Sequence, residues 1–143
     1  MRLTTLVILF GTLIASAAAF AHSGVTNPAV LQRMEAMKQI GDQMKLLGTM
    51  AKGQAPFDAA LAQEAVDRIA LQAADIPDLF RDEASDPKSE ALPTIWENYG
   101  DFITKAEALH AAAQAAIEAE RDLAPTIAAL GEACKACHSH YKD

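Results

Sequence analysis

The segment near the carboxyl end of the chain carries two thiols and an imidazole within five residues, Cys134-Lys135-Ala136-Cys137-His138. Two thiols about one helical turn apart can add to the two vinyl groups on one edge of a porphyrin, and the adjacent imidazole then ligates the iron. The spacing therefore predicts one covalently attached haem c per chain, with His138 as the proximal axial ligand. A redox dithiol, half of a zinc site and a chance occurrence are the alternatives, but neither a βαβ context nor further zinc ligands at knuckle spacing accompany the motif.

The first 21 residues predict a cleavable secretory signal peptide. A single basic residue, Arg2, precedes an apolar segment from Leu6 to Ala19, and the small-x-small pattern Ala19-Phe20-Ala21 follows. An uncleaved membrane anchor is the alternative interpretation. We expect a mature domain over residues 22–143 that works in the bacterial periplasm, outside the cytoplasm, where c-type haem is attached.

The charge of the chain argues against two classes of partner. The sequence has 12 basic and 19 acidic side chains and a formal net charge of −7, and removal of the signal peptide takes Arg2 away as well. An acidic protein is a poor ligand for nucleic acids and for anionic membranes, so neither is expected as a partner after signal cleavage. Apart from the haem ligands, no cluster of titratable residues suggests acid–base or nucleophilic chemistry, so we do not expect an enzyme.

Hydrophobic periodicity predicts two helices in the first half of the mature chain. Asn27 followed by Pro28 is typical of a helix start, and apolar residues at helical spacing continue the first helix over 28–51. Asp58 is a candidate N-cap for the second helix, which is expected to end near Ile76-Pro77. A stretch without periodicity over 79–92 predicts one long surface loop.

Two further helices are predicted in the second half. Pro93 opens a helix that is expected to run to about residue 117, and Asp122 is a candidate cap for a last helix that carries the haem motif. No segment alternates with the period of a strand. Four amphipathic helices with mostly short connections predict an all-α fold, an antiparallel four-helix bundle that encloses the covalently bound haem.

Four features together resemble one family. They are the haem motif at the end of a four-helix chain and the segments Arg33-Met34-Glu35-Ala36-Met37-Lys38, Lys52-Gly53-Gln54-Ala55-Pro56-Phe57-Asp58 and Pro93-Thr94-Ile95-Trp96-Glu97. The chain resembles the class II cytochromes c, the cytochrome c-prime family, over its whole mature length. The resemblance implies redox partner proteins, which the sequence does not identify, and a homodimer that pairs through the first two helices.

The resemblance also implies a role for Met37. High-spin members have an apolar side chain four residues after the Arg of the first helix, whereas low-spin members place a Met ligand there. Met37 occupies this position after Arg33, which implies a His/Met haem that transfers single electrons. The alternative is five-coordinate high-spin iron that binds nitric oxide or carbon monoxide. Because Met34 and Met44 lie on the same helix, Met37 as one more core residue is a further interpretation.

Two basic residues are singled out by the same comparison. Arg33 resembles an Arg that lies near a haem propionate, where a guanidinium can pair with the carboxylate; the other interpretation is a solvated surface charge. Lys142 stands four residues after His138, where most relatives have Arg, and keeps the charge without the planar fork.

Overall fold

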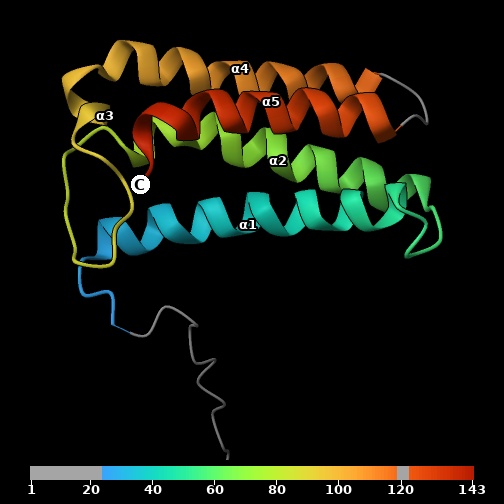
Figure 1. Cartoon of the computed structure of the whole chain (residues 1–143), viewed down its shortest axis with the longest axis horizontal. Coiled ribbons are helices and arrows are strands. Elements are labelled where there is room, and N and C mark those ends of the chain that lie inside the picture. Colours follow the sequence, from blue (N-terminus) through green and yellow to red (C-terminus); the bar gives the residue numbers. More distant parts are fainter. Residues whose placement is uncertain (1–23, 119–122) are drawn as a thin grey trace, which may run out of the picture.

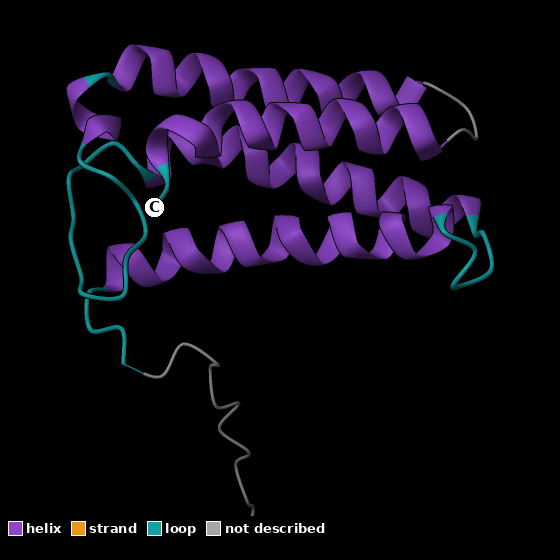
Figure 2. Cartoon of the chain, viewed as in Figure 1, coloured by secondary structure: helices purple, strands orange, loops and turns teal. Residues whose placement is uncertain are grey.

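The structure is a computed structural model, and it describes residues 24–118 and 123–143. The described helices are α1 (Pro28–Ala51), α2 (Ala59–Leu79), α3 (Thr94–Glu97), α4 (Tyr99–Glu118) and α5 (Leu123–Tyr141). The four long helices lie side by side along the long axis of the molecule, and the connections described lie at its two ends (Figures 1 and 2). This confirms the predicted all-α four-helix bundle. The predicted signal peptide over 1–21 and the candidate cap Asp122 lie outside the described residues.

Helix α1 begins and ends where the sequence predicts. The side chain of Asn27 accepts hydrogen bonds from the backbone N–H groups of Ala29 (3.0 Å) and Val30 (3.4 Å), which would otherwise lack partners in the first turn. After Ala51 the chain turns through Gly53, whose φ of +66° is a left-handed conformation that glycine adopts without steric cost. The predicted helix over 28–51 is confirmed.

Helix α2 starts at the predicted cap but continues beyond the predicted end. Asp58 Oδ1 accepts a hydrogen bond from the N–H of Leu61 at 3.0 Å. The helix then passes through Pro77 and ends at Leu79. Pro77 lies in the last turn, and its carbonyl oxygen accepts a hydrogen bond from the Tyr99 hydroxyl of α4, which supplies a partner that the helix itself does not.

The predicted third helix is wrong in one respect, because it is two helices. The single turn α3 ends at Glu97. The next residue, Asn98, is not helical, with a φ of −127° and a ψ of 43°, and α4 begins directly after it. The indole N–H of Trp96 donates to the carbonyl of Phe80 at 2.9 Å and so ties α3 to the end of α2. Asn98 then accepts a hydrogen bond from the N–H of Phe102 at 3.1 Å, which starts the new helix in a different direction.

The core lies mainly between α2 and α4, which pack closely along their length. Small side chains permit this approach, and the buried alanines of the two helices are Ala62, Ala65, Ala70, Ala73, Ala106 and Ala113. Helix α1 packs on α2 and α5 packs on α4, whereas α1 and α5 contact each other little. Side chains of α1 and α5 line a cavity between these two helices. The carboxyl terminus lies near the ends of α1 and α5 at this side of the bundle (Figure 1).

The loop over 80–93 is held more firmly than a surface loop requires. Asp86 is 7% exposed, and one oxygen of its carboxylate accepts hydrogen bonds from the N–H (2.9 Å) and hydroxyl (3.1 Å) of Thr26 and from the N–H of Asn27 (3.2 Å). The other oxygen accepts from the N–H of Lys88 at 3.0 Å. These donors stabilise the ionised form, led by those of Lys88 and Thr26, and lower the pKa of Asp86 to about 2. The carboxylate thus fastens the loop to the start of α1.

Replacing Asp86 with Ala should lower the thermal midpoint at pH 7 and change its dependence on acid. The folded-state pKa of about 2 lies below the ordinary value of 3.8, so the carboxylate stabilises the fold above pH 3.8 and this contribution is lost as the pH falls towards 2. Melting curves followed by circular dichroism should therefore differ at pH 7 and converge over that interval. Asp75→Ala, at an exposed position of α2, should leave the midpoint nearly unchanged. Parallel pH profiles for Asp86→Ala and the unaltered chain would contradict the assignment.

Candidate haem site

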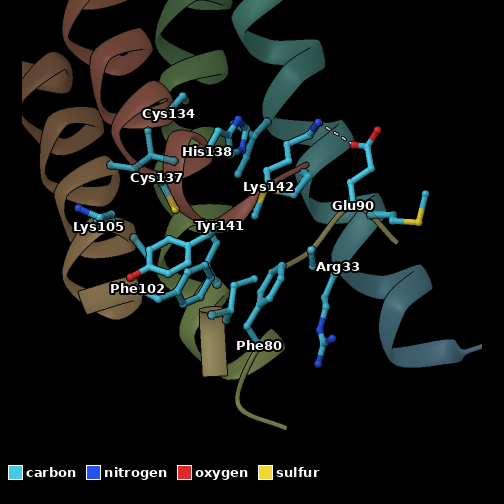
Figure 3. Close-up of a pocket in the computed structure, with 18 of the residues that line it drawn as sticks. Arg33, Phe80, Glu90, Phe102, Lys105, Cys134, Cys137, His138, Tyr141 and Lys142 are labelled. Carbon is cyan, nitrogen blue, oxygen red and sulfur yellow. Dashed lines mark ion pairs between the residues drawn. The ribbon is translucent and has the colours of Figure 1, made fainter. Parts of the chain in front are cut away.

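A cavity of about 220 Å³ opens between α1, α4 and α5, and side chains from the loop before α3 complete its wall. Most of its lining is apolar. Cys134, Cys137 and His138 line it from α5 (Figure 3), and Met37 is among the lining residues of α1. The fold therefore brings to one cavity the four side chains that the sequence predicts to bind haem and iron.

The α5 wall follows from helical geometry. Cys134, Cys137, His138, Tyr141 and Lys142 are spaced so that all five fall on one face of the helix, and all five line the cavity. The two-residue spacer places both thiols on this face, towards the same ligand. Helix α5 presents the whole motif as one rigid surface.

The surroundings of the thiols argue against a redox dithiol. The two cysteines are not joined in a disulfide. Burial raises the pKa of the Cys134 thiol and raises the pKa of Cys137 to about 11. A reactive dithiol needs the opposite shift, towards the thiolate, which basic neighbours or a helix N-terminus normally provide. Protonated thiols in an apolar wall suit covalent attachment to a hydrophobic ring better than they suit thiol exchange.

The imidazole of His138 stands at the rim of the cavity, partly exposed. Partial burial lowers its pKa, Lys142 lowers it further, and Glu90 acts in the opposite direction. A lowered pKa favours the neutral imidazole at pH 7, and the neutral form is the one that ligates a metal. The two flanking charges belong to an ion pair in which Lys142 Nζ lies 2.7 Å from Glu90 Oε2.

The cavity wall formed by α1 contains three methionines and one glycine. Met34, Met37 and Met44 all line the cavity, and so does Gly41, one turn after Met37. A Cβ built on Gly41 would meet no atom within 4 Å, so the space in front of this residue is open. The residues selected from the sequence did not include Gly41. A glycine inside a helix lowers helix stability by about 1 kcal/mol relative to alanine, so its presence there is a signal that could have drawn attention to this position.

Arg33 does not lie on the surface. It is 4% exposed, so the interpretation as a solvated charge is wrong. Its guanidinium donates to three backbone carbonyls at and beyond the end of α2, with Nε 2.8 Å from Leu79 O, Nη1 3.1 Å from Ala84 O, and Nη2 bonded to Asp82 O. Burial lowers the pKa of Arg33, and the charge of Asp82 opposes that shift.

Two aromatic rings enclose the same guanidinium. Its central carbon lies 4.9 Å from the ring centroid of Phe80 and 5.3 Å from that of Trp96. In Figure 3 the side chain of Arg33 extends away from the cysteines and His138. The contact with a haem propionate stays a prediction, and these partners give Arg33 another task, which is to join α1 to the end of α2.

The side chains present fit a c-type haem. Two thiols and an imidazole share one wall, thioethers stand on the facing wall, and the apolar lining suits a porphyrin ring. Cys134 and Cys137 would hold the ring covalently and His138 would hold the iron.

Comparison with known proteins agrees with this donor set. A family model described as Cytochrome C' matches residues 28–142. The chain belongs to the cytochrome c′ family. Members of this family carry a covalently attached c-type haem, and the Cys-x-x-Cys-His segment of this chain has the attachment pattern.

Proteins named cytochrome c-556 and proteins named cytochrome c′ are both similar to this chain over most of its length. A cytochrome c-556 from Agrobacterium fabrum is 36% identical over 146 aligned residues, which cover 99% of this chain and 95% of that protein. The solved cytochrome c′ from Rhodopseudomonas palustris is 32% identical with a TM-score of 0.75, covering 82% of this chain and 98% of the other. A structure of oxidised cytochrome c556 from the same organism has a TM-score of 0.74 at 30% identity, with the same coverage.

The family consists of periplasmic cytochromes that carry electrons or bind gases and are generally not enzymes. Within the part of the chain that the structure describes, no helix is long and apolar enough to cross a membrane. The family assignment therefore agrees with the expected export of the chain.

The covalent attachment can be checked by mass. Protein purified from a host that matures c-type cytochromes should retain one haem per chain after denaturation and acid-acetone extraction, because thioether bonds survive both. Cys137→Ala should retain haem weakly or through a single bond. Complete extraction of haem from the unaltered protein would contradict the assignment of Cys134 and Cys137.

The task of Arg33 can be checked by stability. Arg33→Met should lower the free energy of unfolding in urea by about 3 kcal/mol, because it removes three charge-assisted hydrogen bonds and leaves partly buried carbonyls without their donor. Arg68→Met is a matched control, since Arg68 pairs with Glu64 at 2.6 Å on the exposed face of α2. Its loss should cost less than about 1 kcal/mol. Equal losses for the two variants would show that the buried guanidinium does not hold the bundle.

Proposed function

We propose that the chain is an exported single-electron carrier whose haem iron is ligated by His138 and Met37. The observation that carries the proposal is that these residues line one cavity from two different helices, α5 and α1. A ligand plane between the helices would then have a nitrogen donor on one side and a thioether on the other. Haem supplies an iron centre that exchanges one electron without forming or breaking a bond to the partner.

Met37 is favoured over its neighbours by register. Met34, Met37 and Met44 all line the cavity, but they span ten residues of helix, which is about 15 Å along the axis. Met34 and Met44 therefore cannot both stand opposite a single metal position, whereas Met34 and Met37 are only about 4.5 Å apart along the axis. The resemblance to low-spin relatives selects the residue four positions after Arg33, which is Met37.

The surrounding residues suit electron transfer. A soft thioether favours the low-spin state and raises the reduction potential relative to a harder ligand or water. With both axial positions filled, small gases have no open coordination site. Most of the lining is apolar, which would limit the amount of solvent that has to reorganise around the ring when the charge of the site changes. The hydrogen bonds of Arg33 favour a structural role for this residue over contact with a propionate.

Location and assembly complete the proposal. Residues 1–21 act as a cleavable signal peptide, and the domain over 22–143 works in the periplasm with other redox proteins as donor and acceptor. Cytochromes c′ are often homodimers. A dimer through α1 and α2 is supported here by exposed apolar side chains on α2, since Leu71 is 68% exposed and Leu61 is 39% exposed.

The spin state tests the proposal. The oxidised protein should show a low-spin electron paramagnetic resonance signal and the weak far-red absorption band of sulfur-to-iron charge transfer. Met37→Leu should abolish the band, convert the iron to high spin and let the reduced form bind carbon monoxide readily. Met44→Leu is the matched control, because it replaces a thioether of the same cavity and helix, and it should leave the spectrum nearly unchanged. Met34→Leu should behave in the same way.

An unaltered protein that is already high-spin at neutral pH would overturn the His/Met assignment. The function would then be that of the five-coordinate branch, which binds nitric oxide or carbon monoxide. If the protein is low-spin but Met44→Leu removes the far-red band and Met37→Leu does not, the iron ligand would be Met44. The proposal of an electron carrier would then stand with a different ligand.

A further inference from the structure

An ion pair stands beside the proximal histidine on the cavity wall. Lys142 Nζ lies 2.7 Å from Glu90 Oε2, and both residues line the cavity together with His138 (Figure 3). Lys142 follows His138 by one helical turn, and its backbone N–H donates to the carbonyl of His138 at 3.2 Å. A positive and a negative charge are therefore held next to the predicted iron ligand.

The backbone, rather than the ion pair, fixes where Glu90 lies. The N–H of Asp143 donates to the carbonyl of Glu90 at 2.9 Å, and the N–H of Leu92 donates to the carbonyl of Tyr141 at 3.0 Å. Ala91 and Lys142 form an antiparallel bridge between these bonds. The loop segment is thus seated against the end of α5 by main-chain hydrogen bonds, and loss of the Glu90 charge should leave its position unchanged.

The end of the loop is fastened to the same helix a second time. The Thr94 hydroxyl donates to the carbonyl of His140 at 3.1 Å. Lys142 Nζ also donates to the backbone oxygen of Asp143 at 3.1 Å, so the ammonium keeps a second acceptor if Glu90 is neutralised. Either charge can therefore be removed while the other stays close to its present place.

We propose that Glu90 and Lys142, beside His138, set the reduction potential of the iron from its proximal side through their charges, which act in opposite directions. The proposal rests on His138 as an iron ligand, which is part of the proposed function, but it does not depend on Met37. Oxidised iron carries one more positive charge than reduced iron. The ammonium of Lys142 therefore favours the reduced state and the carboxylate of Glu90 favours the oxidised state. In the intact pair the two effects largely cancel.

Two single substitutions make opposite predictions. In the haem-loaded protein, Glu90→Gln should raise the midpoint potential and Lys142→Gln should lower it. Because solvent screens these partly exposed charges, each change should alter the ratio of reduced to oxidised protein at a fixed applied potential by only about twofold to fourfold. The double variant should return close to the unaltered value. Both charges are partly exposed, at 41% for Lys142 and 65% for Glu90, so high salt should reduce the shifts.

A second ion pair provides the control. Arg68 and Glu64 on α2 have a similar separation of 2.6 Å and similar exposure, and neither lines the cavity. Glu64→Gln and Arg68→Gln remove the same charges from the chain as a whole. Spectroelectrochemical titration should find no shift of comparable size for either.

The outcomes separate this proposal from the proposed function. Shifts of the same sign for Glu90→Gln and Lys142→Gln, or shifts equal to those of the α2 controls, would overturn it. The expected shifts of the midpoint potential have opposite signs for the two variants. If one variant fails to fold, the sign of the shift in the other still tests the proposal. The absorption spectra recorded in the same titration report the spin state. Suppose that the protein is high-spin, that Glu90→Gln raises its midpoint potential and that Lys142→Gln lowers it. This result would refute Met37 as the iron ligand and would still support the effect of the ion pair on the potential.

Discussion

The buried guanidinium of Arg33 is the interaction on which the shape of the bundle end depends. Helix α2 ends in carbonyl groups that cannot be satisfied within the helix, and no basic residue of its own last turn faces them. Arg33 brings a positive charge from α1, donates to the carbonyl of Leu79 at the helix end, and donates to the carbonyls of Asp82 and Ala84 in the loop that follows. Trp96 from α3 and Tyr99 from α4 donate to two further carbonyls of the same region. Helices α1, α3 and α4 are thus all joined to the end of α2, and this junction closes the end of the bundle beside the cavity.

The cavity exists because the four helices are not packed equally. Alanines let α2 and α4 approach closely, while α1 and α5 face each other across a wall of larger and more flexible side chains. Among the described residues, the methionines of α1 and the motif residues of α5 line this space. Gly41 leaves it open where a side chain would otherwise project. A bundle without a prosthetic group would gain stability by closing such a gap, so the arrangement agrees with a family that builds its core around haem.

Most elements could be predicted because their signals are local. Asn27 and Asp58 cap helices through bonds to residues two or three positions away, and the cysteine spacing matches one helical turn. The predicted helix boundaries were wrong or incomplete where a residue distant in the sequence determines where a helix begins or ends. Asn98 separates α3 from α4 where Trp96 ties α3 to the end of α2, and α2 continues past Pro77, whose carbonyl accepts a hydrogen bond from the Tyr99 hydroxyl.

By itself, the sequence determined the helices, their order and the face of α5 that carries Cys134, Cys137 and His138, because a helix places residues three and four apart on one side whatever surrounds it. Only the tertiary structure decided that Arg33 is buried against backbone carbonyls and that Glu90 meets Lys142 beside the histidine. Glu90 is separated from Lys142 by more than fifty residues, and no periodicity relates a loop position to a helix end. Contacts of that kind arise from the packing of whole helices, which sequence spacing alone does not encode.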